Sequence, residues 1–143
     1  MLLDFVVRKG VVYVPTLAKT EAGFYRTVEP VAVVELSDTQ ALKSALKGKL
    51  LEGNPLIPTP EPGTQRTFVL LKYSAVKSLS RFDKDAAYWT ISEENGVYEF
   101  GPLKRRKDRG WEEDSKAMTQ LPPGSSVDDV TDAVVESVQS SLK

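Results

Sequence analysis

The stretch YWTISEENGVYEF, residues 88–100, predicts the fold more directly than any other part of the chain. Polar and apolar residues alternate up to Asn95-Gly96, the pair best suited to a tight primed turn. Strand-forming residues follow that turn, and alternation with a period of two is typical of a strand with one buried face. The stretch therefore predicts an antiparallel β-hairpin.

Further strands are expected before this hairpin. The run LLDFVVRKGVVYVP (2–15) predicts two short strands around a turn at Gly10, and TLAKTEAG (16–23) resembles a loop. FYRTV and VAVVEL are strand-like runs interrupted at Pro30, which cannot donate a ladder hydrogen bond and marks an edge or a bend. The apolar run from Val31 to Leu36 predicts a strand buried on both faces under helices. TFVLLKY (67–73) is also strand-like.

Two main helices are predicted by capping residues and apolar spacing. Ser37 with Gln40 forms a capping-box pattern, apolar residues then recur at helical spacing, and Gly53 suits the position after the helix, which places it at 38–51. A second helix follows Ser125 or Ser126 near the C-terminus, with an apolar stripe on one side. Core packing is the favoured role of this stripe, and a dimer seam is the alternative. Its residues are Val127, Val130, Val134, Val138 and Leu142.

Two further segments predict a short helix and an extended connector between the main elements. SLSRFDKDAA (78–87) predicts a short helix capped by Ser78 or Ser80. NPLIPTPEPGTQ (54–65) holds four prolines, which forbid helix and favour an extended surface connector. A proline-rich ligand for an aromatic groove would look similar. Together the elements predict one α+β domain over residues 1–143, with a mainly antiparallel sheet of about six strands packed by two main helices.

The composition excludes several classes of function. The 143 residues carry 19 Lys and Arg against 20 Asp and Glu, so a net charge of −1 gives no overall attraction to nucleic acid or acidic membranes. Histidine and cysteine are absent, which removes the usual general base, thiol nucleophiles and familiar zinc sites. No phosphate-binding glycine motif occurs. We therefore expect no cofactor, no metal and no enzymatic activity.

A cytoplasmic location is expected from the N-terminus and from the absence of cysteine. Asp4, Arg8 and Lys9 interrupt what would have to be the apolar core of a signal peptide, and no apolar run approaches the ~20 residues of a membrane span. A chain without cysteine also suits a reducing compartment.

The stretch KRRKDRGWEED (104–114) has two interpretations. The basic cluster Lys104–Arg109, flanked by aromatic residues, could bind RNA or single-stranded DNA. Alternatively, Gly110 lets the chain turn, so that bases on one strand pair with acids on the next and leave a bipolar hairpin end. The nearby acids would repel phosphate, which favours the second interpretation. A carboxylate enzyme is a third hypothesis, although neighbouring acids in one strand point to opposite faces.

Several segments together resemble immunity proteins of bacterial contact-dependent growth inhibition and related polymorphic toxin systems. The segments are YVPTLAKTEAGFY (13–25), VEPVAVVELSDT (28–39), GNPLIPTP (53–60), LLKYSAVKS (70–78), and GWEED (110–114) with the following LPPG. The resemblance implies a protein that binds the toxin domain made by the same cell and blocks its active site. The partner it implies is the C-terminal domain of the cognate toxin, and we expect the protein itself to be a monomer or weak homodimer.

Acidic residues and one tryptophan are the candidate partner-binding residues. Many toxins of this kind are nucleases with basic substrate sites, which acidic clusters complement electrostatically. Tryptophan is enriched at the energetic centres of interfaces. The ordinary alternatives are solvated turns for the acids and coverage of the sheet edge for the tryptophan. The candidates are Glu93, Glu94, Trp111, Glu112, Glu113 and Asp114.

Overall fold

Strands from both halves of the chain form one open, mainly antiparallel sheet. The computed structural model describes residues 1–62, 68–107 and 110–141. The main strands follow the spatial order β3-β2-β1-β5-β6-β7, and two two-residue strands, β4 and β8, pair with β2 and β6. The strands are β1 (Leu2–Arg8), β2 (Val11–Thr20), β3 (Tyr25–Glu35), β4 (Leu56–Ile57), β5 (Ala86–Glu94), β6 (Val97–Arg105), β7 (Trp111–Glu113) and β8 (Thr119–Gln120). The predicted α+β class is confirmed.

The two tight hairpins lie where the sequence predicts them. Lys9 and Gly10 take positive φ angles of 50° and 78° and join β1 to β2. Asn95 and Gly96 do the same between β5 and β6, at 54° and 79°. The loop predicted at 16–23 is wrong in its first five residues, because β2 continues to Thr20 and pairs with β3 there. Partner strands on both sides of β2 keep this segment extended.

The strand buried on both faces is β2 and not the run from Val31 to Leu36. β2 is buried along nearly its whole length between β1 and β3. β3 is an edge strand, and its Val33 is 43% exposed. The two runs predicted around Pro30 are one strand, and the peptide bond from Glu29 to Pro30 is cis. Pro30 therefore marks an edge, which is where a residue without an N–H is tolerated.

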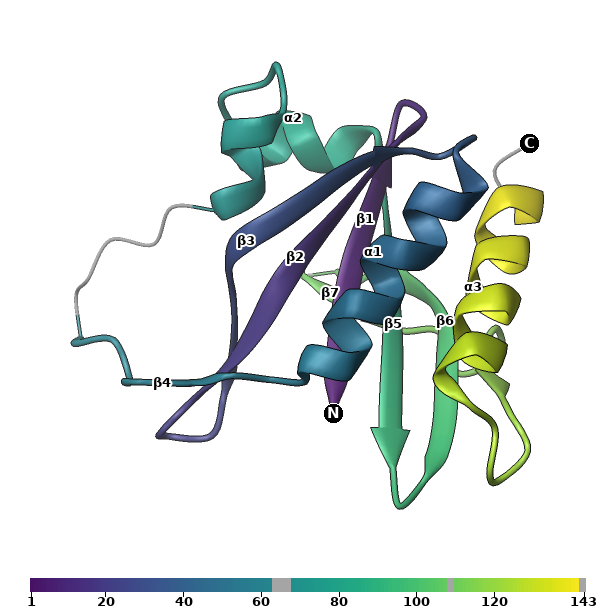
Figure 1. Cartoon of the computed structure of the whole chain (residues 1–143). Helices are drawn as coiled ribbons and strands as arrows, with labels where there is room; N and C mark the ends of the chain where they lie inside the picture. Colours follow the sequence, from purple (N-terminus) through teal and green to yellow (C-terminus); the bar gives the residue numbers. More distant parts are fainter. Residues whose placement is uncertain (63–67, 108–109, 142–143) are drawn as a thin grey trace.

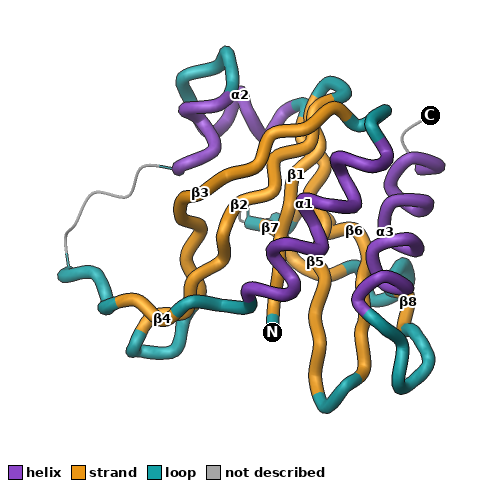
Figure 2. Tube along the Cα trace, in the orientation of Figure 1, coloured by secondary structure: helices purple, strands orange, loops and turns teal. Residues whose placement is uncertain are grey.

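Two helices, α1 (Thr39–Glu52) and α3 (Val127–Ser141), lie side by side over one face of the sheet (Figures 1 and 2). They bury the predicted apolar stripes against the sheet, which confirms core packing for the valines of α3; Leu142 lies outside the described residues. Two ion pairs of 2.9 Å link the helices on the outside. The core of this face includes Leu3, Phe5, Val12, Val14, Leu42, Leu46, Ile91, Val130 and Val134.

The helix starts differ in how well the sequence predicts them. Asp38, not Ser37, caps α1, because its carboxylate accepts from the Ala41 N–H at 3.1 Å. Ser126 caps α3 as predicted, and it exchanges hydrogen bonds with Asp129 in both directions. These bonds lower the pKa of Asp129 below its ordinary value. In both helices a side-chain oxygen satisfies an N–H that has no partner within the helix.

The other face of the sheet is covered near β1, β2 and β3 by two short elements, η1 (Val69–Tyr73) and α2 (Leu79–Lys84). The strand predicted at 67–73 is wrong: residues 69–73 form one 3₁₀ turn, and Thr67 lies outside the described residues. Consecutive apolar residues around Leu70 all face one small core with Phe82, whereas a strand would send alternate ones away. Ser78 caps α2 as predicted, accepting from the Arg81 N–H.

The proline-rich segment runs along the end of the β2–β3 hairpin (Figure 1). Only its residues up to 62 are described, and they are extended as predicted, with one stretch of parallel pairing where Leu56 and Ile57 form β4. The end of the predicted connector, 63–65, lies outside the described residues.

Candidate partner interface

The end of β6 and the whole of β7 lie over the sheet face that α1 and α3 leave free. Pairing between β5 and β6 ends at Pro102, and the next three residues of β6 pair with β7 instead. Figure 1 shows β7 behind the sheet, on the side away from the two long helices. A Cβ atom at Gly101 would lie 3.0 Å from the Ala117 carbonyl oxygen and 3.1 Å from Met118 Cα, so glycine is favoured where this backbone passes close to β6. We call residues 103–105 and 111–113 the ribbon.

The ribbon packs on the sheet through Trp111. Its ring lies 4.3 Å from the ring of Tyr88 on β5, and the Arg105 guanidinium lies 5.1 Å from its centroid. Trp111 is partly buried, and its indole nitrogen is buried without a partner among the described residues. Since the ring packs against side chains of its own chain, the structure favours the sheet-covering role that the sequence left as the alternative.

Asp83 joins α2 to the ribbon. Its carboxylate accepts a hydrogen bond from the Tyr88 hydroxyl and forms an ion pair of 3.7 Å with Arg105. The Asp83 side chain is only 8% exposed. Burial and the hydrogen bond to Asp83 raise the pKa of Tyr88 well above its ordinary value. No pattern in the sequence indicates this role of Asp83, because the contact joins a short helix to a strand end 22 residues later.

Glu113 lies over the sheet near Asp4. Burial, and to a smaller extent the charge of Glu113, raise the pKa of the Asp4 carboxyl, whereas a hydrogen bond with Thr90 lowers it. Because β-strand side chains alternate, Glu112 points away from the face that Glu113 approaches. Both glutamates are exposed, and Asp114 is partly buried.

The other two candidate acids, Glu93 and Glu94, lie at the end of β5, opposite the first residues of β6. Glu93 pairs with Tyr98 on β6, and Glu113 pairs with Leu103 on the same strand. These two positions on β6 are five residues apart, which separates Glu93 from Glu113 by roughly 16 Å along the strand. Glu93 accepts a hydrogen bond of 2.8 Å from the Gly96 N–H and so stabilises the turn. Glu94 is exposed beside it. The structure therefore separates the candidates into a turn group (Glu93, Glu94) and a ribbon group (Trp111 to Asp114).

The basic cluster is partly compensated by acids. Lys104 lies opposite Glu112 in the ribbon, as a bipolar hairpin predicts, and Arg105 is engaged by Asp83 and Trp111. Asp108 and Arg109 lie outside the described residues.

A surface pocket of about 740 Å³ opens beside the ribbon. Arg105 and α2 line it, including Leu79, a large apolar side chain that is 46% exposed. Lys84 and the buried Asp83 also contribute to its wall. Apolar, basic and acidic groups therefore border a single concave surface at the ribbon residue Arg105, a combination that suits contact with another protein.

Neither a metal site nor a membrane span is found in the described part of the chain. Within residues 1–62, 68–107 and 110–141, no three acidic side chains gather closely enough to hold a metal ion. No helix among these residues is both long and apolar enough to cross a membrane.

Comparison with known proteins shows similarity at the level of the fold. No protein-family model and no curated protein sequence matches the chain. A protein of unknown function from Neisseria meningitidis has a TM-score of 0.66 at 14% identity, covering 96% of this chain and 93% of that one. A chain of the CdiA-CT/CdiI toxin and immunity complex from Yersinia pseudotuberculosis has a TM-score of 0.55 at 15% identity, covering 96% and 95%. The shared architecture therefore extends over almost the whole of each chain.

Proposed function

We propose that this chain is a non-enzymatic immunity protein that binds a cognate bacterial toxin domain and blocks its active site. The observation that carries the proposal is the fold shared, nearly end to end, with a chain of a toxin and immunity complex. Sequence features favour the immunity role over the toxin role, since a chain without histidine or cysteine lacks the usual catalytic groups. Such a protein would act in the cytoplasm of the cell that makes the toxin.

The ribbon group is the part of the surface that we assign to the toxin. Glu112 and Glu113 are exposed, and Arg105 on the paired strand of the ribbon lines a concave surface with the exposed side chain of Leu79. In the turn group, by contrast, the Glu93 carboxylate is already engaged by the Gly96 N–H. A nuclease is the toxin class that these acids suit best, because its substrate site is basic and opposite charges speed association.

Co-expression with the toxin tests the proposal. The toxin domain would be taken from the secreted protein encoded beside this chain and expressed from an inducible promoter in a susceptible bacterium. We expect this chain to restore growth and to co-purify with the toxin domain. Growth arrest that persists with this chain well expressed, without co-purification, would contradict the proposal.

A nucleic-acid assay separates the alternative function. RNA or single-stranded DNA affinity that falls steeply with salt, and that disappears when Lys104 to Lys107 are neutralised, would support a nucleic-acid-binding protein instead. We expect no such affinity, because Lys104 faces Glu112 and Arg105 is held by Asp83.

A further inference from the structure

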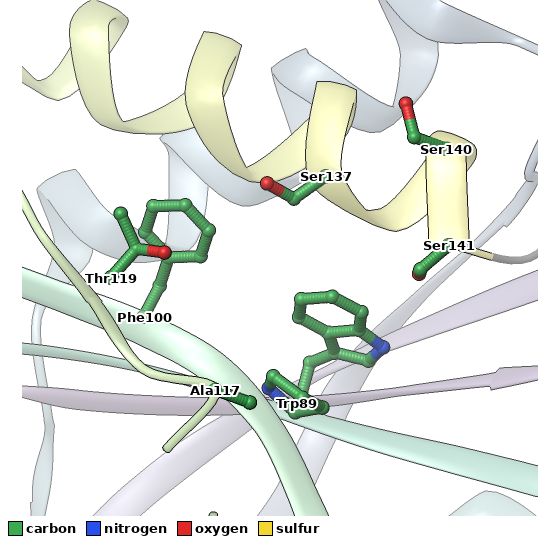
Figure 3. A pocket seen from close by; sticks show the side chains of 8 residues that line it. Trp89, Phe100, Ala117, Thr119, Ser137, Ser140 and Ser141 are labelled. Atoms are coloured by element: carbon green, nitrogen blue, oxygen red, sulfur yellow. The ribbon is translucent and has the colours of Figure 1, made fainter. Parts of the chain in front are cut away.

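Two surface pockets of the molecule differ in the charges that line them. The first, of about 440 Å³, lies between α3 and the strands β5 and β6, and Figure 3 shows serines of α3 above the rings of Trp89 and Phe100. None of the residues that line it is charged, and the two aromatic residues are only 5% and 2% exposed. The second is the pocket of about 740 Å³ beside the ribbon, which we call the α2 pocket. Its lining includes two cationic side chains and one carboxylate. The lining residues are Leu79, Ser80, Asp83, Lys84 and Arg105.

The carboxylate of the α2 pocket is already engaged by its own chain. Asp83 is 8% exposed, one of its oxygens accepts from the Tyr88 hydroxyl, and the other lies 3.7 Å from the Arg105 guanidinium. A distance of 3.7 Å makes an ion pair but is too long for a hydrogen bond. Asp83 therefore compensates part of the charge of Arg105 without using its N–H donors.

Arg105 is an oriented guanidinium with unused hydrogen-bond donors. It lies between its two contacts, 5.1 Å from the centroid of the Trp111 ring and 3.7 Å from Asp83. Among residues 1–62, 68–107 and 110–141 the guanidinium finds no hydrogen-bond acceptor, and the side chain is 43% exposed. A planar guanidinium can donate two parallel hydrogen bonds to one carboxylate, and prior orientation lowers the entropy cost of doing so.

Lys84 adds a second positive charge to the same pocket. Its side chain is exposed and forms neither an ion pair nor a hydrogen bond within the part of the chain that the structure describes. Two cations therefore face one carboxylate that is already shared, which makes the pocket attractive to negative charge. The exposed side chain of Leu79 adds an apolar wall. A carboxylate beside an apolar group matches both features.

We propose that the α2 pocket binds an aspartate or glutamate side chain of the toxin domain that lies next to an apolar residue of the toxin. The proposal rests on the proposed function for the identity of the partner. It gives the interface two signs, with the ribbon acids on basic groups of the toxin and the pocket on an acidic one. Glu112 and Glu113 are exposed in the same ribbon and would repel a chain of phosphates, which favours a single carboxylate over nucleic acid.

Titration of the whole protein with blocked tripeptides tests the pocket without the toxin. The probe is acetyl-Leu-Glu-Leu-amide, and the control, acetyl-Leu-Gln-Leu-amide, has the same shape without the charge. The readout is the ¹H–¹⁵N signal of the Trp111 indole, whose ring contacts Arg105, and Trp89 in the uncharged pocket is the reference. Loss of one indole signal in Trp111→Phe assigns it. We expect the glutamate peptide to move the Trp111 signal in a saturable way and to bind about fivefold more tightly than the glutamine peptide.

Matched variants locate the binding. Lys84→Gln should weaken binding of the glutamate peptide by about threefold or more, because it removes one of the two cations of the pocket. Arg81→Gln removes the same charge from an exposed position of the same helix that does not line the pocket, and it should leave binding unchanged. Amide spectra would verify that both variants are folded.

Four results would overturn the proposal. They are an unmoved Trp111 signal, equal affinity for the two peptides, equal losses in Lys84→Gln and Arg81→Gln, and tighter binding of a thymidine hexanucleotide than of the glutamate peptide. The last result would assign the pocket to nucleic acid.

The growth-rescue experiment separates this proposal from the immunity role. Rescue of growth combined with a failed peptide titration would keep the immunity role and remove the pocket from it. Failed rescue combined with glutamate-peptide binding that depends on Lys84 would keep the carboxylate site and overturn the toxin as its partner.

Discussion

The two faces of the sheet are covered by different kinds of contact. Under α1 and α3, one continuous apolar cluster extends from β1 to the C-terminal helix, and charged residues pair only on its outside. On the other face, a smaller apolar core under η1 and α2 meets the ribbon through polar contacts centred on Asp83. Apolar burial tolerates changes of pH and salt, whereas contacts between charged groups depend on both.

The difference suggests a division of roles, in which the helix face stabilises the fold and the ribbon face contacts the partner. The helix face carries the larger apolar core, which leaves the ribbon face free to carry exposed acids and a concave surface lined by Arg105. A protein that neutralises its partner by binding needs such a rigid support behind a polar contact surface.

The largest effect is expected on the helix face. Leu46→Ala should lower the free energy of unfolding by about 2 to 5 kcal/mol, because Leu46 is fully buried between α1 and the sheet and the change leaves a cavity. Urea denaturation measures the loss. Leu51→Ala on the same helix, where the leucine is 66% exposed, should change it by no more than about 0.5 kcal/mol. Equal losses would mean that α1 is not packed as described.

A smaller loss of stability is expected on the other face of the sheet, where Asp83 joins α2 to the ribbon. Asp83→Ala should lower the free energy of unfolding by about 1 to 3 kcal/mol, because Tyr88 loses its acceptor in a buried place and Arg105 loses its counter-charge. Asp83→Asn keeps an acceptor for Tyr88 and should lose less. If both variants unfold at the wild-type urea concentration, Asp83 does not hold α2 to the ribbon.

The ribbon face should also respond to pH through Asp4. The pKa of Asp4 is raised in the folded protein, so folding favours the neutral form of its carboxyl group. This form stabilises the fold fully below pH 3.8, and the stabilisation is lost as the pH rises through the pKa of the folded protein. Asp4→Asn removes this loss. We therefore expect the variant to exceed the wild type in unfolding free energy at pH 7 and to approach it near pH 3.5. A gain confined to low pH would contradict the burial of Asp4 beneath Glu113.

The smallest effect is expected for the exposed ion pairs between the long helices. Lys47→Ala removes the 2.9 Å pair with Asp128 and should cost no more than about 1 kcal/mol, because water screens both groups. Thermal unfolding at low and high salt measures the difference, which should shrink as salt is added. A loss as large as that of Asp83→Ala would remove the distinction between exposed and buried charge pairs.

Local chemistry explains which parts of the fold could be predicted. The turns at Gly10 and Gly96 and the cap at Ser126 depend on a few neighbouring residues, so their sequence signals were sufficient. Burial depends on partners that are distant in sequence. The apolar runs of β2 and β3 look alike, and only the strand order makes one central and the other an edge.

The candidate site was predictable only in part, for the same reason. The register that places Lys104 opposite Glu112 is the one that a predicted turn at Gly110 implies. The glycine at position 101 depends on the close approach of Met118, and the junction at Asp83 depends on where α2 packs. Neither contact leaves a pattern in the sequence.

Calorimetric titration of the toxin domain into this protein tests the central claim most directly, with charge reversal in either acidic group. We predict a one-to-one complex with wild-type protein, a large loss of affinity for Glu112→Lys/Glu113→Lys, and near-wild-type affinity for Glu93→Lys/Glu94→Lys. Absence of binding by the wild-type protein would contradict the immunity role. Loss of affinity confined to the Glu93/Glu94 variant would contradict the assignment of the ribbon as the toxin-binding surface.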